Sequence, residues 1–321
     1  MPIKVRKRKN PTVFRYPGGK NSFREQFARV CSYVMPEKFP LGRLLSGFGG
    51  GLSIELEYAK TGKDVVVTEK DPIISGFWIV AKYQRPELLT KINNVIEKYC
   101  ETQGNRHFVR RGDPVKVVLE MMDSPDPVER AAGTFIYNRI VFGGDMTNPG
   151  QTRVITTMEH QRLTKNSIRR LAECDLIRVT IIPGDWSQAA KEEGLFYGDP
   201  PYPEIVTDLY EGHETFDHER LAEALLRRGS FLLSYNDVET AERLYGNKAH
   251  FVPLSWTKDA GDGETKGINK ELIIFSKDLC DEAKAHDIVA RAFNPDRLLR
   301  YNWYEGDGGC GSFPCLRVPE V

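Results

Sequence analysis

Short apolar runs alternate with amphipathic segments along most of the chain. Several runs are apolar almost throughout, among them 65–67, 231–233 and 272–275, which is typical of strands that helices cover on both faces. Seven such runs are predicted as strands, at 43–46, 64–68, 177–182, 195–198, 231–235, 251–254 and 272–275. Because helical segments separate these runs, the pattern predicts an α/β protein with a doubly wound sheet.

The alternation stops between about Trp78 and Leu171. There the pattern is helical and polar, with helical runs at 86–101, 115–122 and 128–141, and then loop-like in GGDMTNPGQT. We therefore predict a mainly helical second domain inserted into the sheet domain. The predicted parts are the sheet domain at 1–80 and 172–279, the insertion at 81–171, and a C-terminal extension of unassigned role at 280–321.

Composition narrows the class of protein. The 321 residues include 45 basic and 45 acidic side chains, so the net charge indicates no partner. A hydrophobic content of 40% is that of a globular chain and excludes wholesale disorder, collagen and coiled coil. The sequence has no apolar window of about 18 residues and no apolar stretch after its basic N-terminus. We expect a soluble, cytoplasmic protein that does not enter a membrane.

The six cysteines are scattered, which predicts reduced thiols. Only Cys310 and Cys315 lie close together, and four residues separate them rather than the two that are typical of a zinc knuckle. Since no histidine is near them, we expect no bound metal.

Basic residues gather at two places. The first twenty residues hold seven lysines and arginines and no acid, and Lys7, Arg8 and Lys9 are consecutive. A second group falls on a predicted helix at 162–170. Clustered positive charge displaces counterions from nucleic acid, so a phosphate-binding arm is one interpretation of the N-terminus and a solvated tail is the other.

The most specific motif is the tetrapeptide Asp199-Pro200-Pro201-Tyr202, directly after the apolar run 195–197. In open α/β sheets, ligands bind outside the carboxyl ends of strands. The two prolines hold the backbone stiffly with its carbonyls available as acceptors, Asp199 adds a carboxylate, and Tyr202 adds a flat ring. These groups suit a planar substrate that reacts at an exocyclic amino group. The alternative is an ordinary turn at the end of a strand.

Three further segments have the composition of ligand-binding sites. FRYPGGK at 14–20 leads into a predicted helix, where free N–H donors and Lys20 favour an anion, although a simple turn also explains it. SGFGGGLS at 46–53 lets the backbone approach a ligand closely, and Glu69 stands at the end of the next strand, where nucleoside-binding sheets hold ribose hydroxyls. Asp185 and Trp186 end another strand. In one interpretation Asp185 accepts a hydrogen bond from an adenine amino group and Trp186 packs on the base, and in the other the two residues simply form a turn.

In this order and spacing, FRYPGGK, SGFGGGLS, the strand-end acid, the insertion, PGDW and DPPY resemble the Dam-type DNA adenine-N6 methyltransferases. The resemblance implies a Rossmann-like class I methyltransferase sheet of seven mainly parallel strands, the last one antiparallel, with an inserted target-recognition domain. It implies methyl transfer from S-adenosylmethionine to adenine N6 in double-stranded DNA, by base flipping and direct in-line attack.

The resemblance also assigns residues. The implied catalytic residues are Asp199, Pro200, Pro201 and Tyr202. The implied cofactor-binding residues are Tyr16, Gly18, Gly19, Lys20, Phe48, Gly49, Gly50, Glu69, Asp185, Trp186 and Asp199. The expected DNA-binding residues are Lys7, Arg8, Lys9, Asn138, Arg139 and Asn148.

Two departures from the family pattern limit what carries over. Ser46-Gly47-Phe48 stands where the family usually has Glu-Pro-Phe, and Leu52 occupies a frequent glycine position, which predicts looser cofactor binding. The segment YNRIVFGG at 137–144 resembles the family's NR..FNG segment, but the Arg and Asn expected after it are absent. A GATC target therefore does not carry over.

The family setting implies a cytoplasmic protein of a bacterial or phage-infected cell that acts as a monomer. The sequence leaves open whether a cognate restriction endonuclease is its partner. Two other function classes also stay open. One is a methyltransferase acting on RNA adenine or on a protein amide, and the other is a DNA-binding relative that has lost catalysis. The modified product distinguishes the first from DNA methylation, and cofactor binding without turnover would identify the second.

Overall fold

The computed structural model describes residues 13–16, 19–39, 41–110, 112–146, 149, 153–202, 216–236, 238–257 and 268–293. The N-terminal basic arm lies outside these residues, as does the chain after Phe293 with its two neighbouring cysteines. Among the predicted site residues, Lys7, Arg8, Lys9, Gly18 and Asn148 also lie outside them.

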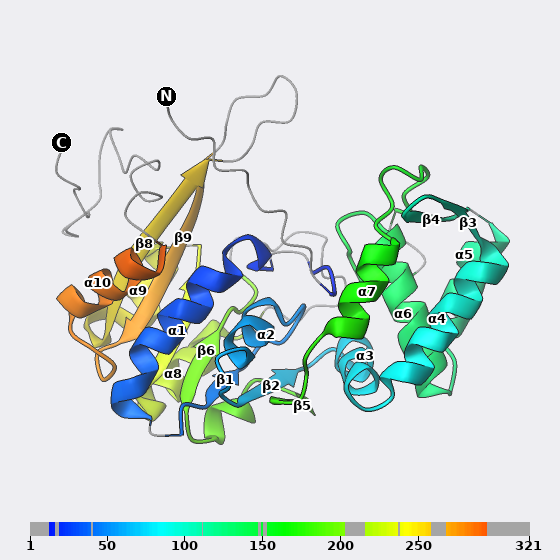
Figure 1. Ribbon diagram of the computed structural model, residues 1–321. Coiled ribbons are helices and arrows are strands. Elements are labelled where there is room, and N and C mark those ends of the chain that lie inside the picture. The colour runs from blue at the N-terminus through cyan, green and yellow to red at the C-terminus, as the bar shows by residue number, and fades with distance from the viewer. Residues whose placement is uncertain are drawn as a thin grey trace.

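A seven-stranded sheet forms the centre of the fold (Figure 1). Its strands are β1 (Leu44–Ser46), β2 (Val65–Glu69), β5 (Val179–Pro183), β6 (Leu195–Gly198), β7 (Phe231–Tyr235), β8 (Ala249–Thr257) and β9 (Ile268–Ser276). The order across the sheet is β5-β2-β1-β6-β7-β9-β8, in which the first five strands are parallel and β9 is antiparallel to both of its neighbours. All seven predicted strands are confirmed, and the sheet is compatible with a Rossmann-like fold.

Helices cover both faces of the sheet because successive strand residues point to opposite faces. Val65 and Val67 belong to the apolar core on one face, whereas Val66 belongs to the core on the other. The first face carries α1 (Arg24–Lys38), α2 (Ser53–Ala59), α3 (Pro72–Tyr83) and α10 (Glu282–Phe293), and the second carries α8 (His218–Arg228) and α9 (Val238–Tyr245). Three short 3₁₀ turns complete the layers: η1 (Asn21–Phe23), η2 (Ala189–Lys191) and η3 (Gly246–Lys248).

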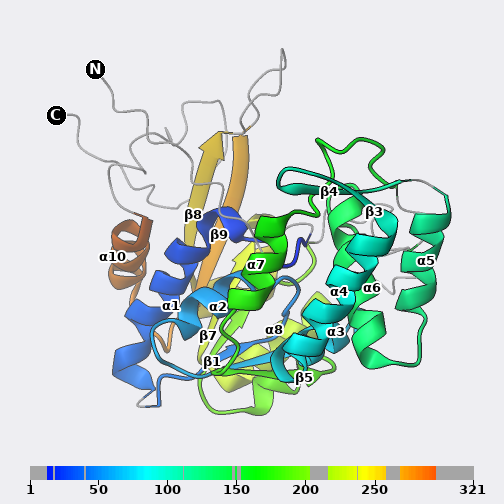
Figure 2. The same ribbon diagram turned by 45° about the vertical axis from the view of Figure 1, so that its right-hand side comes forward.

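The chain between α3 and β5 forms a group of helices with one hairpin, at one side of the sheet (Figures 1 and 2). Its elements are α4 (Arg85–Tyr99), β3 (Cys100–Gln103), β4 (Arg106–Val109), α5 (Asp113–Met122), α6 (Pro127–Ile140) and α7 (Lys165–Glu173). The helical runs predicted here are confirmed. The hairpin was not predicted, because its strands are only four residues long and mostly polar, and β3 is largely exposed.

Helix α6 is the centre of this group and is buried along the ten residues 131–140. It packs against α3, α4 and α5, and the apolar core of these helices continues into the core of the sheet through α3. Within the described residues, no helix combines the length and the apolar character that crossing a membrane requires.

Candidate active site

The topology creates a switch point between β1 and β6. From β1 the chain builds outward to β2 and β5, and it then returns to β6 on the other side of β1. Open α/β sheets bind ligands outside the carboxyl ends of the strands at such a point. The glycine-rich turn after β1, Glu69 at the end of β2 and Asp199 after β6 lie at these ends.

Lys20 joins the FRYPGGK and DPPY segments, which are 179 residues apart in the chain. Its ammonium donates to both carboxylate oxygens of Asp199, at 2.8 and 3.0 Å, and to the Tyr202 hydroxyl at 2.6 Å. Lys20 is 8% exposed, so the ion pair is shielded from bulk water on the lysine side. Two segments that the sequence singled out separately therefore form one cluster.

Two residues outside the predicted set complete this cluster. Glu271 on β9 is buried, and its Oε1 lies 3.4 Å from Lys20 Nζ and accepts a 2.5 Å hydrogen bond from Tyr202 Oη. Ser234 on β7 also donates to Glu271 Oε1. The sequence contained little signal for Glu271, because it follows the polar residues Asn269 and Lys270 and precedes the apolar run 272–275.

The cluster places two carboxylates around one ammonium. Burial by itself lowers the pKa of Lys20, but attraction to Asp199 and Glu271 outweighs burial and raises that pKa above its usual value. Burial raises the pKa of Glu271, and Lys20 opposes that rise. Burial also raises the pKa of Tyr202 well above its usual value, with the two carboxylates acting in the same direction, so its hydroxyl stays protonated.

The aromatic ring of Tyr202 packs on Tyr235 of β7, with the ring centroids 6.2 Å apart and the planes 29° from parallel. Of the two prolines between Asp199 and Tyr202, Pro200 is buried and Pro201 is exposed. The tetrapeptide thus presents a carboxylate, a fixed backbone and a stacked ring at the switch point.

The glycine-rich turn is held against Glu69. The Glu69 carboxylate accepts hydrogen bonds from the backbone N–H of Gly50 at 2.6 Å and of Asp71 at 2.9 Å. A Cβ added to Gly49 would lie 2.6 Å from a valine methyl of β2, so only glycine allows this approach. Burial raises the pKa of Glu69, and the two N–H donors oppose that rise by favouring the carboxylate.

Gly50 and Leu52 of this turn both have a left-handed backbone conformation. Gly50 has a φ of +46°, and a Cβ there would meet the Tyr16 ring at 3.1 Å. Leu52, at the position where the resemblance led us to expect glycine, also adopts a left-handed φ of +50°. Its side chain is 1% exposed, so burial of the leucine offsets the cost of this backbone conformation.

Arg220 of α8 contacts both Asp185 and Trp186. Arg220 donates to Asp185 at 3.0 Å and lies over the Trp186 ring at 4.9 Å, and Trp186 is buried in the second apolar core. Hydrogen bonds from Ser187 and Arg220 lower the pKa of Asp185 despite partial burial, which opposes them. Phe48 packs edge to face on Phe216, with centroids 5.5 Å apart.

Asn138 and Arg139 of α6 bind the N-terminal segment. The Asn138 side chain accepts from Arg15 N at 2.9 Å and donates to Arg15 O at 2.7 Å and to Gly144 O at 3.1 Å. Arg139 donates to Val13 O, and both side chains are almost fully buried. Burial lowers the pKa of Arg139 to about 9, with repulsion from other arginines acting in the same direction. These two predicted DNA-binding residues therefore form hydrogen bonds to the protein's own backbone.

The N-terminal segment is also fixed from its own side. Gly19 N donates to Tyr16 O at 3.1 Å, which closes the turn before Lys20. Arg15 Nη1 donates to Val141 O at 3.1 Å, at the end of α6. Helix α6 of the predicted insertion therefore holds the segment that carries Lys20 to the candidate site.

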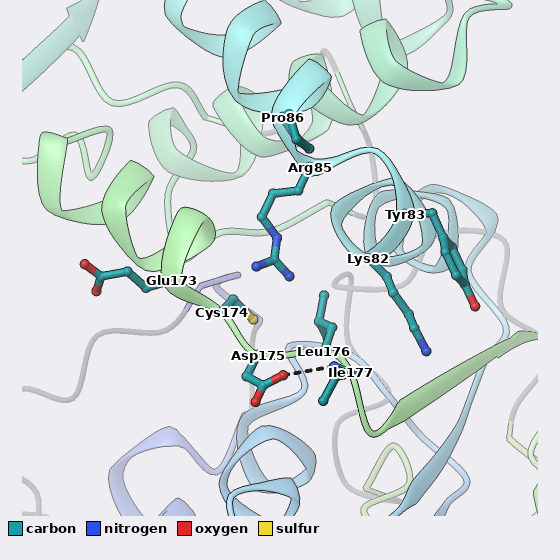
Figure 3. A pocket seen from close by; sticks show the side chains of 9 residues that line it. All are labelled: Lys82, Tyr83, Arg85, Pro86, Glu173, Cys174, Asp175, Leu176 and Ile177. Carbon is teal, nitrogen blue, oxygen red and sulfur yellow. Dashed lines mark hydrogen bonds between the residues drawn. The ribbon is translucent and has the colours of Figure 1, made fainter.

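A cavity of about 520 Å³ lies elsewhere, at the amino end of β5 (Figure 3). Lys82 and Arg85 line it, but their cationic groups already donate to backbone oxygens, those of Val179 for Lys82 and of Ala81 and Ala172 for Arg85. It lies at the opposite end of the strands from Asp199 and is separate from the candidate site.

No protein-family model matches the chain, and a search of curated proteins finds no match either. The functional interpretation rests on the geometry of the site and on the order of its motifs.

Replacing Asn138 with Ala should lower the free energy of unfolding by about 2 kcal/mol or more, because three backbone groups that are buried or partly buried lose their hydrogen-bond partner. Urea unfolding, with the slope on denaturant concentration compared as well, measures this. Asn94→Ala, at an exposed position of α4, is the matched control and should change little. Equal stability of the two variants would show that the α6 contact does not hold the N-terminal segment.

Proposed function

We propose that this protein is an S-adenosylmethionine-dependent DNA adenine-N6 methyltransferase. The observation that carries the proposal is the Lys20–Asp199 ion pair, which brings the FRYPGGK and DPPY segments together at the switch point of the sheet. The sheet of seven mainly parallel strands, in which the last strand along the chain, β9, is antiparallel, is compatible with the sheet that the family resemblance implies. Both observations support the proposal of an amine-binding group beside a nucleoside-binding site.

The residues around the glycine-rich turn fit S-adenosylmethionine. Each carboxylate oxygen of Glu69 accepts one hydrogen bond from a backbone N–H. Each can accept a second one, so the carboxylate can still bind two ribose hydroxyls. Gly49 and Gly50 let the backbone of the turn lie directly against β2 and the Tyr16 ring, which keeps the Gly50 N–H beside Glu69. When bound, the cofactor supplies an electrophilic methyl group on a sulfonium centre.

Asp199 and its neighbours act on the target base in this proposal. An adenine rotated out of the duplex would present its amino group to Asp199 and to the carbonyl of Pro200, and its ring to Tyr202. Hydrogen bonds from the amine to these acceptors make the nitrogen a better nucleophile, and a carboxylate stabilises the positive charge that the nitrogen gains. Rate enhancement comes from positioning and electrostatics rather than from a covalent enzyme intermediate.

A group of mutually repelling arginines supports a polyanionic partner. Apart from burial, the pKa of Arg15 is lowered by Arg162, and that of Arg170 by Arg169 and Arg24. Arg24 is paired with Glu57, and the clustering of the remaining arginines favours phosphate as a counter-ion. They lie on the N-terminal segment, on α1, and on α7 and the residues before it.

An exposed aromatic side chain accompanies these arginines. Phe142 is 69% exposed, directly after Val141, whose carbonyl accepts from Arg15. An apolar ring at the edge of a basic surface suits contact with bases left unstacked by flipping. Phe142 was not among the residues predicted to bind DNA, although its segment was.

Asp199→Ala should reduce methyl transfer by roughly a hundredfold or more, because the amine loses its carboxylate acceptor. The measurement is transfer of labelled methyl from S-adenosylmethionine to unmethylated duplex DNA, with the labelled nucleoside identified. Asp64→Ala, an exposed acid at the other end of β2, is the matched control and should transfer normally. N6-methyladenine formed at the wild-type rate by the Asp199 variant would contradict the assignment, and label in RNA alone would redirect it to RNA.

Arg170→Gln should weaken DNA binding and reduce the slope of log affinity against log salt by about 1, because one phosphate contact is lost. Fluorescence anisotropy with duplex DNA over a series of salt concentrations measures both quantities. Arg227→Gln, which removes an exposed arginine of α8 paired with Glu223, is the control. An unchanged slope in the Arg170 variant would show that Arg170 does not contact a DNA phosphate.

A further inference from the structure

The active-site cluster contains an apparent conflict. The proposed reaction needs Asp199 to accept hydrogen bonds from the target amine, but both of its carboxylate oxygens already accept from Lys20, at 2.8 and 3.0 Å. A lysine held between the two oxygens of one carboxylate neutralises its charge and takes one acceptor site on each oxygen, and the Tyr202 hydroxyl lies 3.1 Å from Asp199 Oδ1 as well. An amine approaching Asp199 therefore competes with Lys20.

Glu271 offers Lys20 a second position. Its Oε1 is 3.4 Å from Lys20 Nζ, against 2.8 Å for the nearer oxygen of Asp199, so a small movement of the ammonium exchanges one carboxylate for the other. Tyr202 and Ser234 both donate to the same Oε1, which fixes the Glu271 side chain in place. Burial of Glu271 keeps its attraction for the ammonium strong.

Within the part of the chain that the structure describes, four polar or charged groups face Glu271. They are Lys20 from the N-terminal segment, Asp199 and Tyr202 from the turn after β6, and Ser234 from β7. On its other side, β8 places Leu254 opposite Glu271 in the strand pairing. Lys20 is the one cation among these groups.

We propose that Glu271 is a positioning residue that takes over Lys20 when the target amine binds, which frees Asp199 to accept the amine hydrogens. The inference rests on the proposed methyl transfer to an exocyclic amine. With Lys20 shared between two carboxylates, the cluster keeps one net negative charge beside a nitrogen that becomes positive. Glu271 does not touch the substrate and acts through Lys20 and Asp199.

The test compares Glu271→Gln, Lys20→Gln and the double variant. Glutamine keeps the shape of glutamate but does not hold an ammonium by charge, so Lys20 should stay on Asp199 in Glu271→Gln. Glu219→Gln, an exposed acid on α8 paired with Arg243, is the matched control. Transfer is measured in a single turnover on unmethylated duplex DNA with saturating S-adenosylmethionine, and cofactor affinity and urea unfolding are measured separately.

Glu271→Gln should transfer methyl about tenfold more slowly or worse, with cofactor affinity within about twofold of wild type. Adding Lys20→Gln to it should raise the transfer rate again, by about threefold or more, because removing the lysine frees Asp199 by another route. A residue that only supports the fold gives no such recovery. Glu271→Asp should retain part of the wild-type rate, since it keeps the charge.

Three results would overturn the inference. One is a wild-type rate in Glu271→Gln, and another is a double variant that is no faster than Glu271→Gln. The third is a loss of cofactor affinity in Glu271→Gln that accounts for the slower transfer. Each of these leaves the proposed function intact, whereas a wild-type protein that transfers no methyl group would overturn both proposals.

Discussion

The ion pair between Lys20 and Asp199 is the interaction on which the candidate active site depends. Removing a lysine from water is unfavourable unless a carboxylate compensates for it, and here the carboxylate stands 179 residues further along the chain. The pair fixes the segment before α1 to the turn after β6. Because Tyr202 and Glu271 also bond within this cluster, one charge contact positions groups from β6, β7 and β9.

Helix α6 makes this arrangement possible from outside the sheet. Asn138 bonds both the N–H and the carbonyl of Arg15, much as a neighbouring strand would. The helices between α3 and β5 are thus tied to the segment that carries Lys20. If these helices bind a nucleic acid, as we propose, a movement of α6 on binding would be transmitted to Lys20 through the N-terminal segment.

The sequence predicted the sheet more completely than the site. All seven strands were evident, several of them because strands covered on both faces are apolar almost throughout, and the strand ends marked Glu69 and Asp199. It did not reveal that Lys20 and Asp199 touch, since pairing across 179 residues depends on topology. It also assigned Asn138 and Arg139 to DNA, because a polar pair in a helix carries no sign of which backbone it will bond.

A double-mutant cycle between Lys20 and Asp199 tests the central claim most directly. Lys20→Met, Asp199→Asn and the combined variant are unfolded in urea, and the coupling free energy is taken from the four stabilities. Direct contact of two buried or half-buried charges predicts a coupling of about 1 kcal/mol or more. Additive effects of the two substitutions would mean that the two segments do not meet, and the proposed active site would not exist.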